Sequence, residues 1–571
     1  MTINSRDRAL TQCRLGSGNE HGRLIRLFVT WIIGVNLIAL LIVAVWFRCR
    51  SLENIPGLNG DEAWYGVQAV QILHGSPISW QTPTGNLLNP FFIGPLTLLH
   101  LWFQPSIALL RTLAVASGLK ALVINWILCR LIFDRRMAWI STAVLAVLPI
   151  AIAYSRIAWD ASQSMAATLP VVYFSLGAIR FPRWCWQLIS AAVACQVIAV
   201  VVHPTNVFAA TAIAAALVAQ WKPSDAGSSA GQQVRRLSAM VVVFSLGVLI
   251  GLLSLGFLTG IWIFGLMHTP MPKLLEAHLV DSLNSSNMLQ AIILFPRLFI
   301  GGTVYRYVAG SHSWFEWPLA LNREGFGIDV LVFWILILAA WLVLWRSWKR
   351  AGRLEDGVLI AAWVLAMAVF LLLAGPRAMA PGQERFAIGL IGLTVIFLCR
   401  AASLAMTRIS WTSGLALTAA VALGWAMLAD FHVHYFRFIE KTGGQAHRTF
   451  RTAAEEPKAA ALKYVLQHRA NGETWIITSE WWNLWPLRYL SSAESNICVF
   501  TPQEASNRAD AFAIATKEAR VWFVEFSNSK ALLELEAKSA DSRLEQHHIK
   551  DYAGQPILTI AHPQAKDAIR H

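Results

Sequence analysis

The sequence predicts an α-helical polytopic membrane protein with about 11–13 transmembrane helices and a small α/β domain at its C-terminal end. Hydrophobic residues make up 56% of the 571 residues and charged residues only 14%, whereas an ordinary soluble domain is about a quarter charged. Apolar stretches long enough to cross a bilayer recur between residues 27 and 430. After residue 430 these stretches stop and charged residues return, which indicates a domain outside the membrane.

The chain begins with a polar, arginine-rich arm over residues 1–26, which we expect in the cytoplasm. The apolar stretch that follows lacks a small-residue cleavage site, so we interpret it as a retained span and not as a signal peptide. Residues 89–103 are apolar but short and contain prolines, which favours an interfacial or re-entrant segment. The predicted spans are 27–47, 107–132, 137–155, 163–180, 185–202, 205–221, 237–264, 328–346, 357–374, 386–400 and 410–430.

The orientation follows from the distribution of lysine and arginine. With the N-terminus inside and residues 89–103 not spanning, every predicted cytoplasmic connection is basic, as is usual for membrane proteins. These connections are 134–136, 180–183, 222–236, 346–353 and 400–408. They carry most of the net charge of +14, and no nucleic-acid-binding motif is present. Loop 48–106, corners 154–160, 203–206 and 375–385, and loop 265–327 are then expected outside.

The region 27–430 is therefore predicted as the transmembrane domain and 431–571 as an extracytoplasmic α/β domain. In the tail, the patterns predict helices at 457–468, 482–490 and 503–518, and strands at 474–478, 497–500, 521–526, 543–549 and 556–561. The tryptophan-rich segment 481–489 is expected to pack inside this domain, with contact to an acceptor as the alternative.

An acidic pair, Asp61-Glu62, lies just beyond the first predicted span. Acidic residues favour the first turn of a helix, so a structural role is one interpretation. The functional interpretation is general-base catalysis, in which a carboxylate takes a proton from an attacking hydroxyl or amine. A carboxylate here could also hold a divalent cation through oxygen.

Four further residues near the predicted outer face could take part in the same chemistry. Arg156 and Asp160 lie four apart, either as a helix-end ion pair or as a phosphate ligand and a second carboxylate for a metal or an acceptor. Arg385, at the mouth of a late span, could hold a lipid phosphate or simply extend toward the interface. His203 could donate to a phosphate, act as a base, or cap a helix.

These motifs, in this order, resemble the GT-C membrane glycosyltransferases, specifically the protein O-mannosyltransferase and lipid A aminoarabinose transferase branch (glycosyltransferase families 39 and 83). The resemblance covers residues 25–430, and the tail resembles the small outer domain of many bacterial members. The residues that carry it are Asp61-Glu62, Asn89-Pro90, Asp134-Arg135-Arg136, Ser155-Arg156 with Asp160, and Arg385-Phe386. Two positions depart from the pattern: Leu88-Asn89-Pro90 replaces a Lys-Pro-Pro or His-Pro-Pro motif, and His203-Pro204-Thr205 replaces Thr-Lys-Gly.

The resemblance implies inverting transfer of a sugar from a polyprenyl-phosphate donor to a lipid, glycan or protein acceptor on the outer face of the inner (plasma) membrane. Asp61, with Glu62 beside it, would be the catalytic carboxylate. Arg385, with Arg156 or His203, would bind the donor phosphate, and Asp160 the acceptor or a metal. No cofactor is certain from the sequence, and a divalent cation is possible.

Other classes of protein compete with this interpretation. A multi-span transporter or flippase would place charges on broken helices near mid-membrane and often shows repeats, whereas here the polar residues gather at one predicted face and no repeat is visible. An outer-face sugar polymerase or ligase would lack the early Asp-Glu loop. A non-catalytic assembly or sensor protein is the remaining alternative.

Overall fold

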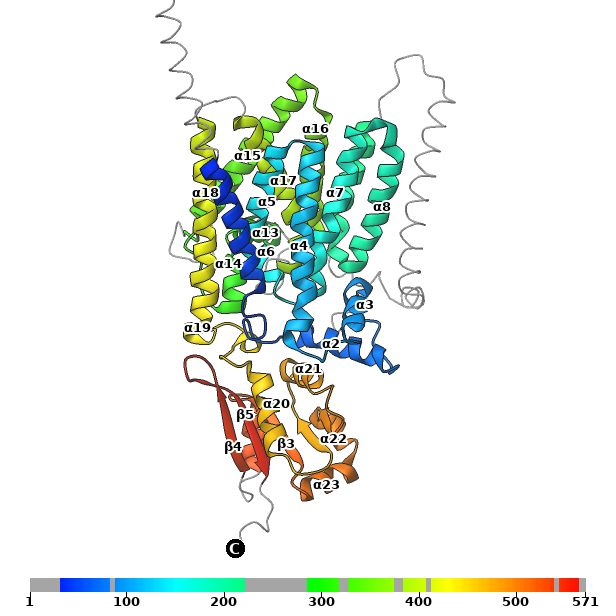
Figure 1. Ribbon diagram of the computed structural model, residues 1–571, viewed down its shortest axis with the longest axis vertical. Helices are drawn as coiled ribbons and strands as arrows, with labels where there is room; N and C mark the ends of the chain where they lie inside the picture. Colours follow the sequence, from blue (N-terminus) through cyan, green and yellow to red (C-terminus); the bar gives the residue numbers. More distant parts are fainter. Residues whose placement is uncertain are drawn as a thin grey trace, which may run out of the picture.

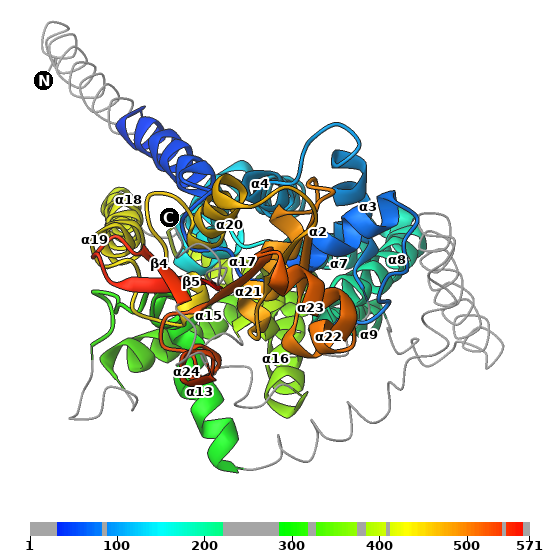
Figure 2. The same ribbon diagram turned by 90° about the horizontal axis from the view of Figure 1, so that it is seen from below.

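The computed structural model describes residues 31–82, 88–220, 285–317, 327–373, 384–406, 412–538 and 544–563. Its helices form an elongated body, and a small sheet with flanking helices lies below it (Figure 1). Seen from below, this sheet domain covers part of the body, and the first helix lies at the edge of the body (Figure 2). The predicted arm, residues 1–26, and the predicted span 237–264 lie outside the described residues.

Seven helices in the described part are long and apolar enough to cross a membrane, or eight if one bent pair counts as a span. The seven are Trp31–Cys49, α4 (Ile107–Ile132), α8 (Cys185–Val202) with the turn before it, α15 (Ile328–Ala351), α16 (Leu354–Leu373), α17 (Ile388–Met406), and Leu417–Thr442, which contains most of α18 (Thr412–Phe431) and all of α19 (Phe438–Thr442). Each coincides with a predicted span, so the prediction of a polytopic helical membrane protein is confirmed.

Three other predicted spans are helical but differ in detail. They correspond to α5 (Arg135–Val147) with α6 (Pro149–Tyr154), α7 (Ser164–Arg180), and η3 (Pro204–Ala209) with α9 (Ala210–Gln220). The predicted span 137–155 is wrong as a single helix, because the backbone of Leu148 is extended and Pro149 begins a new helix. Proline lacks an N–H, and it disfavours the helical conformation in the residue before it.

The predicted outer loop 265–327 contains a helical element that the hydrophobic pattern did not indicate. Helix α13 (Ser285–Phe299) is followed by α14 (Gly302–Val304) and η4 (Tyr305–Ala309), and the pair bends by 90°. Gly301 allows the bend because its φ of +81° lies in the left-handed region that favours glycine. Pro296 and Arg297 interrupt the apolar run, so this segment reads as a loop from sequence although it packs into the body (Figure 1).

Two helices lie between the body and the sheet domain: α2 (Gly60–Leu73) and α3 (Pro90–Leu99) (Figure 1). Helix α3 has 10 residues, so it is too short to span a bilayer, as the sequence predicted. The basic connections α4–α5, α7–α8 and α15–α16 lie at the opposite end of the body. The last long helix continues to Thr442, past the predicted boundary at 430, so residues 431–442 belong to the helical body.

The C-terminal domain is built on a five-stranded sheet of order β2-β1-β3-β5-β4. The strands are β1 (Thr474–Ile477), β2 (Ile497–Phe500), β3 (Val521–Phe526), β4 (Leu544–Lys550) and β5 (Pro556–Pro563). The first three are parallel, and β5 and β4 are added antiparallel. The helices are α20 (Pro457–His468), α21 (Trp481–Leu490), α22 (Pro502–Ser506), α23 (Ala509–Lys517) and α24 (Lys530–Lys538). All five predicted strands are present, and the predicted helix 503–518 is divided in two.

A buried carboxyl group in this domain makes its stability depend on pH. Burial raises the pKa of Glu525, on β3, to about 7. A carboxyl whose pKa is raised on folding contributes stability at low pH that is lost as pH rises through the folded pKa. We expect Glu525→Gln to stabilise the domain by up to about 3 kcal/mol well above pH 7 and not at pH 5.

The measurement is the temperature at which the sheet domain loses resistance to protease, at pH 5 and pH 8.5. Glu545→Gln, at an exposed position on β4, is the control and should show no pH-dependent change. Equal stabilisation of the Glu525 variant at both pH values would contradict the assignment.

Candidate active site

Four of the predicted site residues meet at the end of the helical body that faces the sheet domain. Asp61 lies in the first turn of α2, Asp160 begins η1 (Asp160–Gln163), His203 ends α8, and Arg385 lies in η6 (Glu384–Phe386). The Arg385 Nη1 is 4.0 Å from the Asp61 Oδ2. The charges of Asp160 and Arg385 act on both Asp61 and His203, so the four groups form one electrostatic unit.

The carboxylate of Asp61 is held at the start of α2 by local structure. Asn59 caps the helix, and its side-chain oxygen accepts a hydrogen bond from the Asp61 N–H at 2.7 Å. The Asp61 Oδ1 accepts a hydrogen bond from the Trp481 Nε1 at 3.1 Å, and the side chain is 28% exposed. Burial raises the pKa of Asp61 above its ordinary value, and Arg385 opposes this rise. A carboxylate with a raised pKa is better matched to accepting a proton near neutral pH.

Tyr65 stands one turn after Asp61 and links it to the second carboxylate. Burial, then the charges of Asp160 and Asp61, raise the pKa of Tyr65 well above its usual value, so its hydroxyl stays protonated. Its side chain also interacts directly with Asp160, which is buried and accepts a hydrogen bond from the Ala161 N–H at 2.7 Å. Asp160 is therefore held in place by its neighbours.

His203 and Arg385 supply hydrogen-bond donors that the described residues do not use. The His203 Nδ1 lies 2.6 Å from the Thr205 hydroxyl and 3.4 Å from the Thr205 nitrogen. In the tautomer in which Nδ1 accepts from these two groups the ring proton is on Nε2, a buried atom with no partner among the described residues. Burial lowers the pKa of His203, which keeps the ring neutral at pH 7. The Arg385 guanidinium lies near the rings of Trp159 and Phe386, and its Nε is likewise buried without a described partner.

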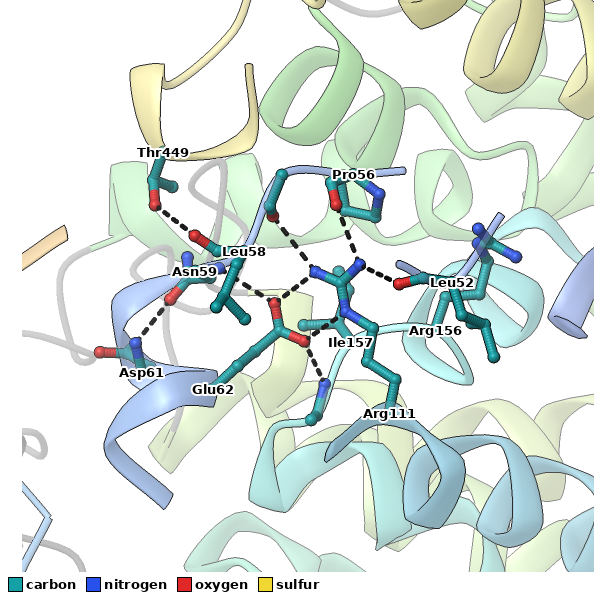
Figure 3. Close-up of polar contacts among 12 residues, drawn as sticks. Leu52, Pro56, Leu58, Asn59, Asp61, Glu62, Arg111, Arg156, Ile157 and Thr449 are labelled. Atoms are coloured by element: carbon teal, nitrogen blue, oxygen red, sulfur yellow. Dashed lines mark hydrogen bonds and ion pairs between the residues drawn. The ribbon is translucent and has the colours of Figure 1, made fainter. Parts of the chain in front are cut away.

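Glu62 is not part of this group. Its side chain is fully buried and forms a two-point ion pair with Arg111 on α4, with both bonds at 2.9 Å (Figure 3). The carboxylate also accepts from the N–H groups of Asn59 and Ala158. All its acceptor positions are engaged, so the arrangement argues against the predicted direct catalytic part for Glu62 and makes it an anchor for the start of α2.

Arg156 is also separate from the group. Its guanidinium is buried and donates to the backbone carbonyls of Phe47, Ser51 and Ile55, and it packs over the Phe436 ring. These donors are occupied by the turn after the first helix. The geometry therefore argues against the predicted phosphate contact of Arg156.

A cavity of about 1310 Å³ runs alongside the site between α3, α4, α7 and α8. Its wall is mostly apolar and includes Val202, the residue before His203, and Gln163, the last residue of η1. Gln163 accepts a hydrogen bond from Asn89 and donates to the Phe91 carbonyl, which attaches α3 to η1. The cavity thus approaches the His203 and Asp160 corner of the site.

A single charged side chain lines this cavity. Lys120 lies near the middle of α4 with an exposed side chain, and it makes no ion pair or hydrogen bond with the described residues. A charged group within a transmembrane helix is costly and generally marks a functional position. The signal for this residue is present in the sequence as a lysine inside a predicted span, but Lys120 is not among the residues predicted at the outer corners.

The predicted possibility of a divalent cation finds no preformed ligand set in the part of the chain that the structure describes. No group of three or more His, Cys, Asp or Glu side chains there is arranged to hold a metal ion. Two further residues of the site, Tyr65 and Trp481, were not predicted as such. Tyr65 belongs to the same short segment as Asp61, whereas Trp481 lies in the segment expected to pack inside the C-terminal domain, with contact to an acceptor as the alternative.

No protein-family model and no curated protein sequence matches the chain. Among solved structures, ArnT from Cupriavidus metallidurans bound to undecaprenyl phosphate is similar, with a TM-score of 0.52 and 13% identity over 94% of this chain and 98% of that one. The apo oligosaccharyltransferase of Archaeoglobus fulgidus has a TM-score of 0.46 and 14% identity over 86% and 69%. The similarity to ArnT confirms the expected resemblance at the level of the fold: the chain has the GT-C fold.

Proposed function

We propose that this protein is an inverting glycosyltransferase that moves a sugar from a polyprenyl-phosphate donor to an acceptor at the outer face of the membrane. The observation that carries the proposal is a carboxylate facing a guanidinium at 4.0 Å, in a site whose His203 and Asp160 corner is approached by an apolar cavity. The position of the basic connections at the opposite end of the body supports an outward-facing site.

In this reaction the acceptor oxygen or nitrogen attacks the anomeric carbon from the side opposite the phosphate. The new bond forms as the bond between the anomeric carbon and the phosphate oxygen breaks, and the phosphate leaves with the electron pair. Asp61 takes the proton of the acceptor, for which its raised pKa suits it. A substrate bound between Asp61 and Arg385 would separate the two side chains. Asp61 would then contact the acceptor, and Arg385 would contact the phosphate.

The departing phosphate needs donors, and Arg385 and His203 provide them. The Arg385 Nε is a buried donor without a partner in the described residues, and the His203 Nε2 is a second one in the tautomer that carries its proton there. Leaving such a donor unsatisfied costs about 1–3 kcal/mol, and phosphate oxygens would relieve that cost. Donors that bind the charge as it develops on the leaving group are typically the largest contribution to catalysis.

The cavity beside the site suits the isoprenoid chain of such a donor. It is mostly apolar, it adjoins α3, and it approaches His203. The fold neighbour ArnT is bound to undecaprenyl phosphate, a lipid of the class proposed here. Lys120 supplies a cation in the cavity wall, and we assign it to attraction of the donor's phosphate.

Lys120→Gln is expected to raise the KM for the donor about tenfold with little change in kcat, because it removes one charge-assisted contact worth about 1.4 kcal/mol. Lys120→Arg keeps the charge and is the matched control. Steady-state kinetics with varied donor and native mass spectrometry of undecaprenyl phosphate binding provide the measurements. Unchanged donor affinity in the glutamine variant would remove Lys120 from this role.

The test of the proposed function is incubation of the purified protein in lipid nanodiscs with a panel of polyprenyl-phosphate sugars and membrane extract. Mass spectrometry of the products should show a sugar transferred to an acceptor and free polyprenyl phosphate. The same experiment in sealed vesicles distinguishes the main alternative. Movement of the lipid or a solute across the bilayer without a covalent product would support a flippase or transporter instead.

A further inference from the structure

The C-terminal domain contributes a side chain to the candidate active site. We propose that Trp481 is a positioning residue that orients the Asp61 carboxylate, so that the docked sheet domain is a working part of the site; this rests on the proposed function. The Trp481 Nε1 donates to the Asp61 Oδ1 at 3.1 Å, across 420 positions of sequence.

The two oxygens of Asp61 have different neighbours. Oδ1 accepts from the indole of Trp481, and Oδ2 faces the guanidinium of Arg385 at 4.0 Å. The indole N–H is a donor only and does not titrate in this range, so it fixes Oδ1 without competing for a proton. This leaves Oδ2, the oxygen that points toward Arg385, to receive the acceptor's proton. A substrate between the two side chains would have its acceptor at Oδ2 and its phosphate at Arg385.

The contact depends on close packing of α21 against α2. A Cβ at Gly60 would lie 2.8 Å from the Trp481 ring, and a Cβ at Gly66 would overlap the ring of Tyr489. The buried Tyr489 also donates its hydroxyl to the Ser106 carbonyl at 3.1 Å, which attaches α21 to the start of α4. Two glycines on one helix and an anchoring tyrosine on the other define a single docked position.

The sheet domain in turn fixes the start of α21. Trp481 is the first residue of this helix. It follows three residues after Thr478, which extends the parallel strand β1. Just before it, Glu480 pairs with Arg448 at 2.6 Å, and the Ser479 N–H donates to Glu525 on β3. The indole is thus held by the core of the sheet domain and not by a free loop.

The contact has a consequence for the protonation of Asp61. A hydrogen bond donated to the charged form of a carboxylate favours that form. The charged groups that face Asp61 are Arg385 from η6, Asp160 from η1 and Glu62 from α2. Of these, Arg385 favours the charged carboxylate, as the indole N–H does, whereas the two acids disfavour it. Removing the indole donor should therefore raise the pKa of Asp61 further and move the loss of activity in acid to higher pH.

The variant for the test is Trp481→Phe, which keeps an aromatic ring against Gly60 and removes the N–H. The control is Trp485→Phe on the same helix, the same chemical change at an indole whose Nε1 has no partner in the described residues. We expect the acid limb of kcat/KM to shift upward by about 0.5–1 pH unit in the first variant only. Binding of undecaprenyl phosphate should remain unchanged in both.

A second measurement does not require transfer activity. Dicyclohexylcarbodiimide modifies protonated carboxyl groups in apolar surroundings, so the pH dependence of Asp61 labelling, read by peptide mass spectrometry, reports its protonation directly. The midpoint should move to higher pH in Trp481→Phe and not in Trp485→Phe. Coincident midpoints would overturn the inference whether or not transfer is observed, whereas a wild-type protein that transfers no sugar would overturn the proposed function alone.

Discussion

Asp61→Asn is expected to lower kcat by about 10²–10⁴-fold, because a positioned general base contributes that much to a proton-transfer step. Asparagine has nearly the same shape, and its side-chain oxygen can still accept the hydrogen bond from Trp481. It does not take up a proton at neutral pH. The expected loss is therefore chemical and not structural, and donor affinity should change far less than turnover.

The measurement is single-turnover transfer from a polyprenyl-phosphate sugar, with thermal unfolding as the check on folding. Asp510→Asn, at an exposed position on α23, is an equivalent change away from the site and should behave as wild type. Turnover of the Asp61 variant above about a tenth of the wild-type rate would remove this residue from the role of base.

Arg111→Met is expected to destabilise the protein by about 3–5 kcal/mol, because it leaves the Glu62 carboxylate buried without its partner. Arg111 also donates to the carbonyls of Leu52, Pro56 and Gly57, which form the turn before α2 (Figure 3). The same change should therefore loosen the segment that presents Asp61. Activity and stability should fall together in this variant, unlike in Asp61→Asn.

A double-mutant cycle separates the ion pair from the backbone contacts. Adding Glu62→Gln to Arg111→Met should recover part of the lost stability, since a neutral amide is less costly to bury unpaired than a carboxylate. Thermal unfolding in one detergent gives the four free-energy differences of unfolding. Additive effects of the two substitutions would contradict a strong coupling between Glu62 and Arg111.

Asp61 and Glu62 illustrate the limit of reasoning from sequence at this site. They are neighbours in an acidic pair, and no sequence property separates a base from an anchor. On a helix, successive side chains point about 100° apart, so one turns inward to Arg111 and the other toward Arg385. The position of α4 and η6 around α2 decides which carboxylate meets Arg111 and which faces Arg385. That position belongs to the tertiary structure.

Arg156 and Lys120 show the same limit, since the first was predicted to be at the site and the second was not. Arg156 was singled out because it stands at an outer corner, yet its guanidinium satisfies carbonyls of a turn about 100 residues earlier in the chain. Lys120 stands inside a predicted span, away from the outer corners, yet it lines the cavity next to the site. Charge and position along the chain indicate that such residues matter, but not what they contact.

By itself the sequence determined that this protein is a helical membrane protein with a five-stranded C-terminal domain, because span length and strand alternation are local properties of the chain. It also indicated six candidate site residues at one predicted face: Asp61, Glu62, Arg156, Asp160, His203 and Arg385. Only the tertiary structure decided that Glu62 pairs with Arg111, that Arg156 binds backbone carbonyls, that α13 folds into the body, and that Trp481 reaches Asp61. Those outcomes depend on contacts between distant segments, which leave no periodic signal in the sequence.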